Sequence, residues 1–176
     1  MKILDTARLT LRLMNEDDAP FMLALMNQPD WHRYIGDRGL RTDEAMREFI
    51  RTGPMASQQK MGFSFYVAER REDGIPVGIA GLVKRPQLDD IDIGYGFLET
   101  WRGRGYAWEA TAAVLHDART RLGITRIAAI TSPDNVRSIR IVERLGLRPA
   151  GMIAMKGGEP DTNLYLRDFA ADPDGA

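Results

Sequence analysis

The segment from residue 90 to residue 131 constrains the fold of this 176-residue chain more than any other. Apolar side chains alternate with small or acidic ones over 90–98, which is the period-two pattern of a half-buried strand. A glycine-rich turn follows, and apolar residues then recur at helical spacing over 106–122, until Gly123 ends the pattern. The next segment, RIAAIT at 126–131, predicts another strand. Strand, turn, helix and strand in this order form a βαβ unit.

The remainder of the chain predicts a mixed α/β sheet of the α+β type rather than a doubly wound one. Helices are expected after the capping residues Asn15 and Thr42 and after the SPDN segment at 132–135. Gly53 and Pro54 are expected to interrupt the second of these helices. Further strands are predicted over 9–13, 63–68, 77–83, 149–154 and 162–166.

The length predicts one domain over residues 1–169, followed by a disordered tail at 170–176. The segment 27–39, which contains Trp31 and Tyr34, has a turn-rich composition and is predicted to be a loop between the first two helices.

The composition excludes several classes of function. Lys and Arg number 24 against 25 Asp and Glu, a balance that lacks the concentrated positive field of a nucleic-acid binder. There is no cysteine, which excludes disulfides, thiolate metal sites and a cysteine nucleophile. His32 and His116 have no ligand partner at metal spacing, so no metal site is expected. No apolar segment reaches the roughly 20 residues of a membrane span, so we expect no membrane partner and a cytoplasmic location.

The turn RGRG at residues 102–105 is a candidate anion site. A strand that feeds a helix through such a turn exposes backbone N–H groups at the helix N-terminus, where the helix dipole adds partial positive charge. Gly103 and Gly105 remove side chains from the approach path, and Arg102 and Arg104 can add charge. A phosphate or diphosphate is the expected guest. The alternative, that the glycines only permit a tight turn, stays open.

Two common phosphate-binding loops do not fit this spacing. The chain has no G-x-x-x-x-G-K-[ST] string of a P-loop. A G-x-G-x-x-G fingerprint that starts at Gly103 meets Trp108 at its third glycine position, and the following strand ends in Thr131 rather than in an acidic residue.

The string R-x-x-G-x-A, carried by Arg102, Gly105 and Ala107, is similar to the acyl-CoA diphosphate loop of the GNAT superfamily of N-acetyltransferases. Three longer segments add to the likeness: RLTLRLMNEDDAPFMLALMNQPD, IDIGYGFLETWRGRGYAWEA and SPDNVRSIRIVERLGL. Together they resemble the RimJ/RimL-like branch, which includes the ribosomal-protein-alanine acetyltransferases, over roughly residues 5–167. The resemblance implies a GNAT fold, with a mixed, mostly antiparallel sheet of about seven strands, a central splayed strand pair and about four helices. It also implies acetyl-CoA as the cosubstrate.

The resemblance assigns cofactor contacts by position. Loop residues would bind the diphosphate, strand residues would bind pantetheine through their backbone, and one strand N–H would polarise the thioester carbonyl. From the residues alone, Asn135 is also a good helix N-cap and Ser138 is also acceptable as a surface serine. The assigned positions are Tyr95, Gly96, Phe97, Arg102, Gly103, Arg104, Gly105, Tyr106, Ala107, Asn135 and Ser138.

Two positions that carry catalytic groups in relatives differ in this chain. The tyrosine that many relatives place seven residues after the asparagine is Val142 here, and the glutamate that some place five residues before it is Ile130. Ser138, a water molecule or Tyr165 must then protonate the leaving thiolate, if an acid is needed.

The general base is predicted from the strand pattern. Asp92 lies on the same strand face as Gly94 and Gly96, where a carboxylate would be partly desolvated. Glu69, at the end of another strand, is the second candidate. Without a cysteine or a G-x-S-x-G elbow, direct attack of the amine in a ternary complex is the simpler mechanism.

Relatives shape their acceptor pocket in the segment that here contains Trp31 and Tyr34. These aromatic residues can equally form a lid that packs on the core. The expected acceptor is a primary amine, either a protein N-terminus or a small molecule, and a homodimer is expected from the family alone. The alternative function is a catalytically silent CoA-binding or interaction domain with the same fold.

Overall fold

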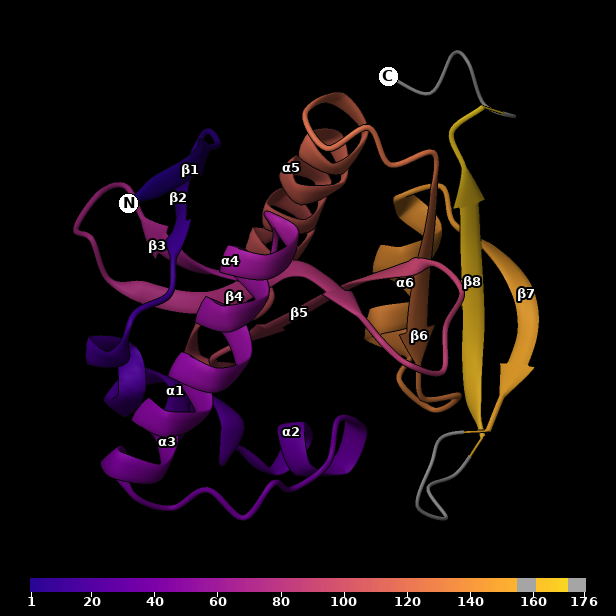
Figure 1. The fold of residues 1–176 in the computed structure, drawn as a ribbon. Coiled ribbons are helices and arrows are strands. Elements are labelled where there is room, and N and C mark those ends of the chain that lie inside the picture. The colour runs from indigo at the N-terminus through magenta and orange to yellow at the C-terminus, as the bar shows by residue number, and fades with distance from the viewer. Residues whose placement is uncertain (155–160, 171–176) are drawn as a thin grey trace.

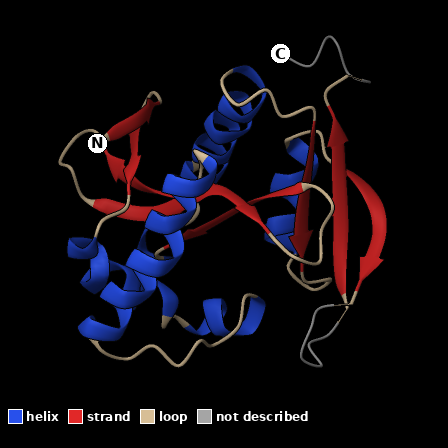
Figure 2. Ribbon diagram, in the orientation of Figure 1, coloured by secondary structure: helices blue, strands red, loops and turns tan. Residues whose placement is uncertain are grey.

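A computed structural model describes residues 1–154 and 161–170. These residues contain one eight-stranded sheet in the order β1-β2-β3-β4-β5-β6-β8-β7 (Figure 1 and Figure 2). Neighbouring strands are antiparallel except β5 and β6, which are parallel. The strands are β1 (Lys2–Asp5), β2 (Leu9–Leu13), β3 (Phe65–Arg70), β4 (Pro76–Lys84), β5 (Ile91–Phe97), β6 (Arg126–Thr131), β7 (Arg148–Ile153) and β8 (Thr162–Asp168).

Helices cover both faces of the sheet and create two hydrophobic cores. Helices α1 and α3 form one core with Val67 and Ile79, whereas α5 and α6 form the other with Tyr66 and Ala80. Successive side chains of a strand point to opposite faces, so neighbours in β3 and β4 belong to different cores. The helical elements are η1 (Glu16–Asp18), α1 (Ala19–Met26), α2 (Pro29–Tyr34), α3 (Asp43–Ile50), the π-turn η2 (Arg51–Met55), α4 (Ala56–Met61), η3 (Glu99–Trp101), α5 (Tyr106–Thr120) and α6 (Val136–Arg144).

The predicted mixed sheet is confirmed, with one strand more than the seven expected. The additional strand, β1, has only four residues, too few to produce a clear alternating pattern. The central βαβ unit lies where the pattern predicts it, with its second strand at 126–131. Asn15 and Thr42 accept hydrogen bonds from backbone N–H groups as N-caps.

The helix that Thr42 caps is interrupted around Gly53 and Pro54, as predicted: α3 ends at Ile50, and both residues lie in the π-turn η2. The chain then continues as α4. A proline lacks the N–H that an α-helix needs, and a π-turn lets the helical path continue around the missing bond.

The parallel pair β5–β6 separates soon after it begins, as the resemblance implies. The two strands pair only at Ile91 with Ile127 and at Asp92 with Ala128. Beyond this point the β5 edge from Ile93 to Phe97 has no strand partner on that side within the described part of the chain. The split leaves backbone groups of a central strand available to a ligand.

Within residues 1–154 and 161–170, no helix is both long and apolar enough to cross a membrane. The same residues contain no cluster of three His, Asp or Glu side chains that could hold a metal ion. A single domain over residues 1–169 stays a prediction, and all of the expected tail except Ala170 lies outside the described residues.

Candidate functional site

A cleft of about 590 Å³ occupies the split between β5 and β6 and extends to α2, the start of α5 and α6. Six arginines line this cleft but only two carboxylates, Asp30 and Asp92, so its charge favours a polyanionic ligand. The cleft brings together every predicted site residue except Arg104. Its lining includes Trp31, Tyr34, Asp92, Tyr95, Gly96, Phe97, Arg102, Gly103, Gly105, Tyr106, Ala107, Asn135 and Ser138.

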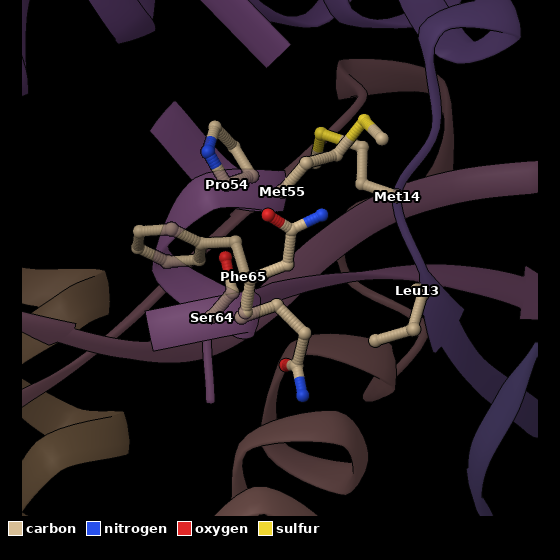
Figure 3. Close-up of a pocket in the computed structure, with 8 residues that line it drawn as sticks. Leu13, Met14, Pro54, Met55, Ser64 and Phe65 are labelled. Carbon is tan, nitrogen blue, oxygen red and sulfur yellow. The ribbon is translucent and has the colours of Figure 1, made fainter. Parts of the chain in front are cut away.

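A second, smaller cavity of about 110 Å³ lies beneath η2 and α4 (Figure 3). Met14, Pro54 and Phe65 line both this cavity and the cleft, so the two adjoin. None of the eight residues that line the cavity is ionisable, so it offers no acid or base for catalysis.

The turn between β5 and α5 has the backbone of an anion site. Gly103 and Gly105 adopt positive φ angles of 75° and 82°, in the left-handed region that favours glycine. Gly105 is the N-cap of the 15-residue α5, and no side chain caps that helix end. Within the described chain no group accepts a hydrogen bond from the N–H of Tyr106, Ala107 or Trp108. These N–H groups can therefore bind an anion with the help of the helix dipole.

The side chains of the two arginines of the turn contact other residues of the protein. Arg102 donates from Nε to the carbonyl oxygen of Phe97 (3.1 Å) and from Nη1 to Asp30 (2.6 Å). Arg104 lies over the ring of Trp101, 4.8 Å from its centroid. Both guanidinium groups thus have partners within the protein, whereas the N–H groups at the start of α5 have none in the described chain.

The short helix α2 carries Trp31 and Tyr34, which the sequence placed in a loop. That prediction was wrong because α2 has only six residues and no apolar periodicity; its one start signal is a proline at its first position. The helix spans the mouth of the split and is fastened to α6 and the turn before it. Arg137 donates to Asp30 (2.8 Å), and Arg33 donates to Asp134 (2.7 Å).

The indole ring of Trp31 packs directly on β5. A Cβ atom at Gly96 would lie 2.5 Å from Cζ3 of Trp31, so only glycine permits this contact. The glycine face of β5 therefore receives aromatic side chains of the protein itself, because a Cβ at Gly94 would meet the ring of Phe65 at 3.1 Å. The indole N–H of Trp31 is buried without a hydrogen-bond partner in the described residues and belongs to the cleft lining. Buried polar groups are normally paired, so a bound ligand is a natural acceptor for this donor.

Asp92 lies at the apex of the split, on the face that the strand pattern predicts. Its side chain is only 3% exposed and accepts a hydrogen bond from Nε of Arg85 (2.5 Å). The backbone N–H of Ile130 on β6 donates to the same carboxylate. Burial raises the pKa of Asp92 to about 6, against the opposing effects of Arg85 and of the Ile130 N–H. A carboxylate with this pKa is ionised at neutral pH yet can accept a proton.

Glu69, the second candidate base, lies on β3 outside the cleft lining. It accepts a hydrogen bond from Nε of Arg12 (2.7 Å), and the same guanidinium also pairs with Asp18 (2.6 Å). This ion-pair group fastens β2, β3 and η1 together, and Asp92 is the better placed base.

Comparison with known proteins identifies the family. The model of the GNAT acetyltransferase domain matches residues 8–148 of the chain. The chain belongs to the GNAT acetyltransferase family. GNAT enzymes use acetyl-CoA, so this protein is an acetyl-CoA-dependent N-acetyltransferase.

Individual GNAT relatives agree with the fold. The chain is 31% identical to the uncharacterized N-acetyltransferase YoaA of Bacillus subtilis, over 93% of this chain and 94% of that protein. A GNAT acetyltransferase from Bacillus anthracis shares the fold with a TM-score of 0.78 and 26% identity, covering 96% of this chain and 98% of that one. RimL, a ribosomal L7/L12 alpha-N-protein acetyltransferase in complex with coenzyme A, has a TM-score of 0.81 at 20% identity, with 96% and 98% coverage.

Across the split from β5, the start of α6 contributes two of the predicted site residues. Asn135 caps α6 by accepting a hydrogen bond from the N–H of Ser138 (3.1 Å), and both line the cleft. Burial raises the pKa of the Tyr95 phenol, and the nearby Ser138 acts against this rise. The strand pattern placed Tyr95 on an apolar face, and nothing local indicated that its hydroxyl would reach α6.

Tyr165, the other tyrosine considered as an acid, lies on β8 with 5% of its surface exposed, and it belongs to the hydrophobic core rather than to the cleft. The hydroxyl groups of Tyr95 and Ser138 are therefore better placed than Tyr165 to meet a leaving group in the cleft.

Proposed function

We propose that this GNAT enzyme transfers the acetyl group of acetyl-CoA directly to a primary amine bound in the cleft, with a polypeptide N-terminus as the first candidate acceptor. The observation that carries the proposal is the shared cleft. It joins an uncapped helix N-terminus, the opened edge of β5 and a buried carboxylate whose pKa lies near neutrality.

The cosubstrate fits the turn and the split. The free N–H groups at the start of α5 suit a diphosphate, and a Cβ at Gly103 would meet open space, so nothing blocks the approach. The side chain of Tyr106 is buried, so this residue contributes its N–H alone. The backbone groups between Tyr95 and Phe97 that face the split, apart from the Phe97 carbonyl oxygen that Arg102 holds, can accept and donate along the pantetheine arm, with Asn135 across the split. The likeness of the fold to RimL with bound coenzyme A supports this assignment.

The acceptor side begins at Asp92. The acceptor ammonium gives a proton to this carboxylate, and the free amine then attacks the thioester carbonyl carbon. Collapse of the tetrahedral adduct forms the amide bond and breaks the C–S bond. Since the chain has no cysteine, an acetyl-cysteine intermediate cannot form. Direct transfer needs no covalent enzyme intermediate.

The acceptor pocket favours an amine that carries an apolar group and a carbonyl. Apolar side chains of the α1–α3 core reach the cleft, among them Met22, Met26 and Ile79. The unpaired indole N–H of Trp31 can donate to a carbonyl oxygen of the acceptor, and Tyr34 lies one helical turn away on α2. A polypeptide whose first residue has an apolar side chain supplies the amine, the apolar group and the carbonyl oxygen.

The test is thiol release from acetyl-CoA with matched acceptors. The panel contains peptides with an apolar first residue, the same peptides with a charged first residue, N-terminally blocked peptides with one lysine, and simple alkylamines. Preference for the first group supports the proposal. Turnover of alkylamines alone would assign the enzyme to small amines, and coenzyme A binding without turnover on any acceptor would favour the catalytically silent domain.

A further inference from the structure

The turn between β5 and α5 has an unusual backbone at the residue that begins the helix. Gly105 has φ 82° and ψ 0° as the N-cap of α5, and no side chain caps the helix. Most N-cap residues instead have an extended backbone and a side chain that accepts from the first helical N–H groups. The proposed function places the coenzyme A diphosphate on this turn, so an inference about what holds its shape rests on that function.

Arg8, in the connection between β1 and β2, fastens this turn from outside the cleft. Its Nη1 donates to the carbonyl oxygen of Arg104 at 2.9 Å, and Arg8 does not line the cleft. The C=O and N–H groups of a planar trans peptide point in opposite directions, and the described chain contains no cis peptide. A carbonyl of Arg104 directed at Arg8 therefore directs the N–H of Gly105 away from Arg8. No group of the described chain accepts from that N–H.

Glu109, on the first turn of α5, holds Arg8 in place. Its Oε2 lies 2.7 Å from Nε and 2.6 Å from Nη2 of Arg8. Its Oε1 accepts from the backbone N–H of Arg8 (2.8 Å) and from Oγ1 of Thr6 (2.6 Å). Hydrogen bonds between charged groups are the strong ones, so this short segment and α5 are firmly joined. The backbone N–H of Glu109 also donates to the carbonyl oxygen of Gly105 (3.0 Å), so the carbonyl groups of residues 104 and 105 are both held.

The guanidinium of Arg8 fills the space behind the turn. It lies 4.6 Å from the centroid of the Tyr106 ring, and a Cβ atom at Gly105 would lie 3.3 Å from its Nη2. The pair also balances charge at this helix end. A carboxylate in the first turn of α5 would repel a bound diphosphate, and the guanidinium of Arg8 offsets the charge of Glu109.

We propose that Arg8 and Glu109 are positioning residues for coenzyme A binding. The pair holds the peptide between residues 104 and 105 so that the N–H groups from Gly105 to Trp108 are directed at the diphosphate. Neither side chain touches the ligand, which agrees with the absence of both from the cleft lining. The proposal differs in sign from a simple charge effect. Glu109→Gln removes a negative charge near the anion, which by itself would tighten binding, whereas loss of the hold on Arg8 weakens it.

The experiment measures the Kd of coenzyme A by calorimetry for Arg8→Lys, Glu109→Gln and the double variant. Lysine keeps the charge but lacks the fork that reaches both Glu109 and the carbonyl oxygen of Arg104. Each single variant is expected to raise the Kd by about tenfold, as for the loss of one hydrogen bond to a charged group. The double variant should lose little more than either single variant, because both act through the same contacts.

The ion pair between Arg126 and Asp90 provides a matched control. The two side chains lie 2.9 Å apart and are 50% and 17% exposed, close to the 49% and 13% of Arg8 and Glu109. Neither lines the cleft. Arg126→Lys and Asp90→Asn should therefore leave the Kd of coenzyme A unchanged.

Steady-state kinetics separate positioning from a general loss of structure. In Arg8→Lys and Glu109→Gln the acetyl-CoA KM should rise with the Kd. The kcat at saturating acetyl-CoA should stay within about twofold of the wild type, since the turn does not hold the reacting atoms. Melting temperatures should change no more than in the control pair.

Three results would overturn the proposal: a Glu109→Gln protein that binds coenzyme A as tightly as the wild type or more tightly, equal losses in the control variants, or a fall in kcat at constant KM. If Glu109→Gln does not fold, Arg8→Lys decides the question alone, because half of the Arg8 side chain lies in solvent, and an unchanged Kd in that variant refutes the idea. A wild-type protein that does not bind coenzyme A would instead refute the proposed function.

Discussion

Replacing Asp92 with asparagine separates catalysis from stability at one position. The side chain is almost fully buried between Arg85 and the N–H of Ile130, and asparagine keeps the shape and an acceptor oxygen. What it removes is the ability to take a proton. General base catalysis typically contributes 10²- to 10⁴-fold, so Asp92→Asn is expected to lower kcat by about that range.

The pH profile gives a second readout of the same change. Because the raised pKa of Asp92 is about 6, the wild-type kcat/KM should rise as pH increases through 6 and then level off. The carboxylate is the active form, so activity is lost as pH falls. In Asp92→Asn this limb should be absent from the residual activity.

Stability should move in the opposite direction to activity. The folded-state pKa of about 6 lies above the ordinary value of 3.8, so the folded protein binds this proton more tightly than the unfolded chain. The carboxyl therefore favours folding at acid pH, and that contribution is lost as pH rises from about 4 to 6. The difference corresponds to about 3 kcal/mol at most. A neutral asparagine avoids this cost, so Asp92→Asn should melt several degrees above the wild type at pH 7 and at a similar temperature near pH 3.5.

Steady-state kinetics from pH 5 to 9 and thermal melts at both pH values test this reasoning. An Asp92→Asn enzyme with wild-type kcat and an unchanged pH profile would rule out Asp92 as the base. A variant that melts below the wild type at pH 7 would contradict the unfavourable burial of the ionised carboxylate.

Two further substitutions test the two ends of the cleft. Gly105→Glu should abolish measurable coenzyme A binding by calorimetry, because it places an acidic side chain beside the α5 N–H groups. Gly123→Glu controls for backbone strain, since Gly123 also has a positive φ (65°), and it should retain affinity; equal losses in both would point to backbone strain instead. Trp31→Phe keeps a ring against Gly96 but removes the indole N–H, so it should raise the KM for a peptide acceptor about tenfold. The acetyl-CoA KM should stay unchanged, and an unaltered peptide KM would disprove the proposed hydrogen bond.

The parts of the fold with local signals could be predicted from the sequence. The β5–α5–β6 unit is set by alternation, glycine at the turn and helical periodicity within about 40 residues, and Asp92 follows from the parity of β5. The free N–H groups at this turn could also be predicted, because Gly105 directly precedes a helix.

What the sequence did not reveal depends on contacts between distant segments. The helix α2 is held by pairs such as Arg33 with Asp134, which are 101 residues apart. Trp31 packs on Gly96, and Tyr95 lies near Ser138; in both cases the two residues are far apart in the sequence and come together only in the folded chain. Propensity and periodicity carry no information on such pairs, so the acceptor and acid sides could not be drawn from pattern alone.

The most direct test of the whole account is a crystal structure with saturating coenzyme A. We predict diphosphate oxygens within hydrogen-bond distance of the backbone N–H groups between Gly103 and Ala107, and the sulfur in the split between β5 and β6. A nucleotide bound elsewhere, with those N–H groups satisfied by the protein itself, would contradict it.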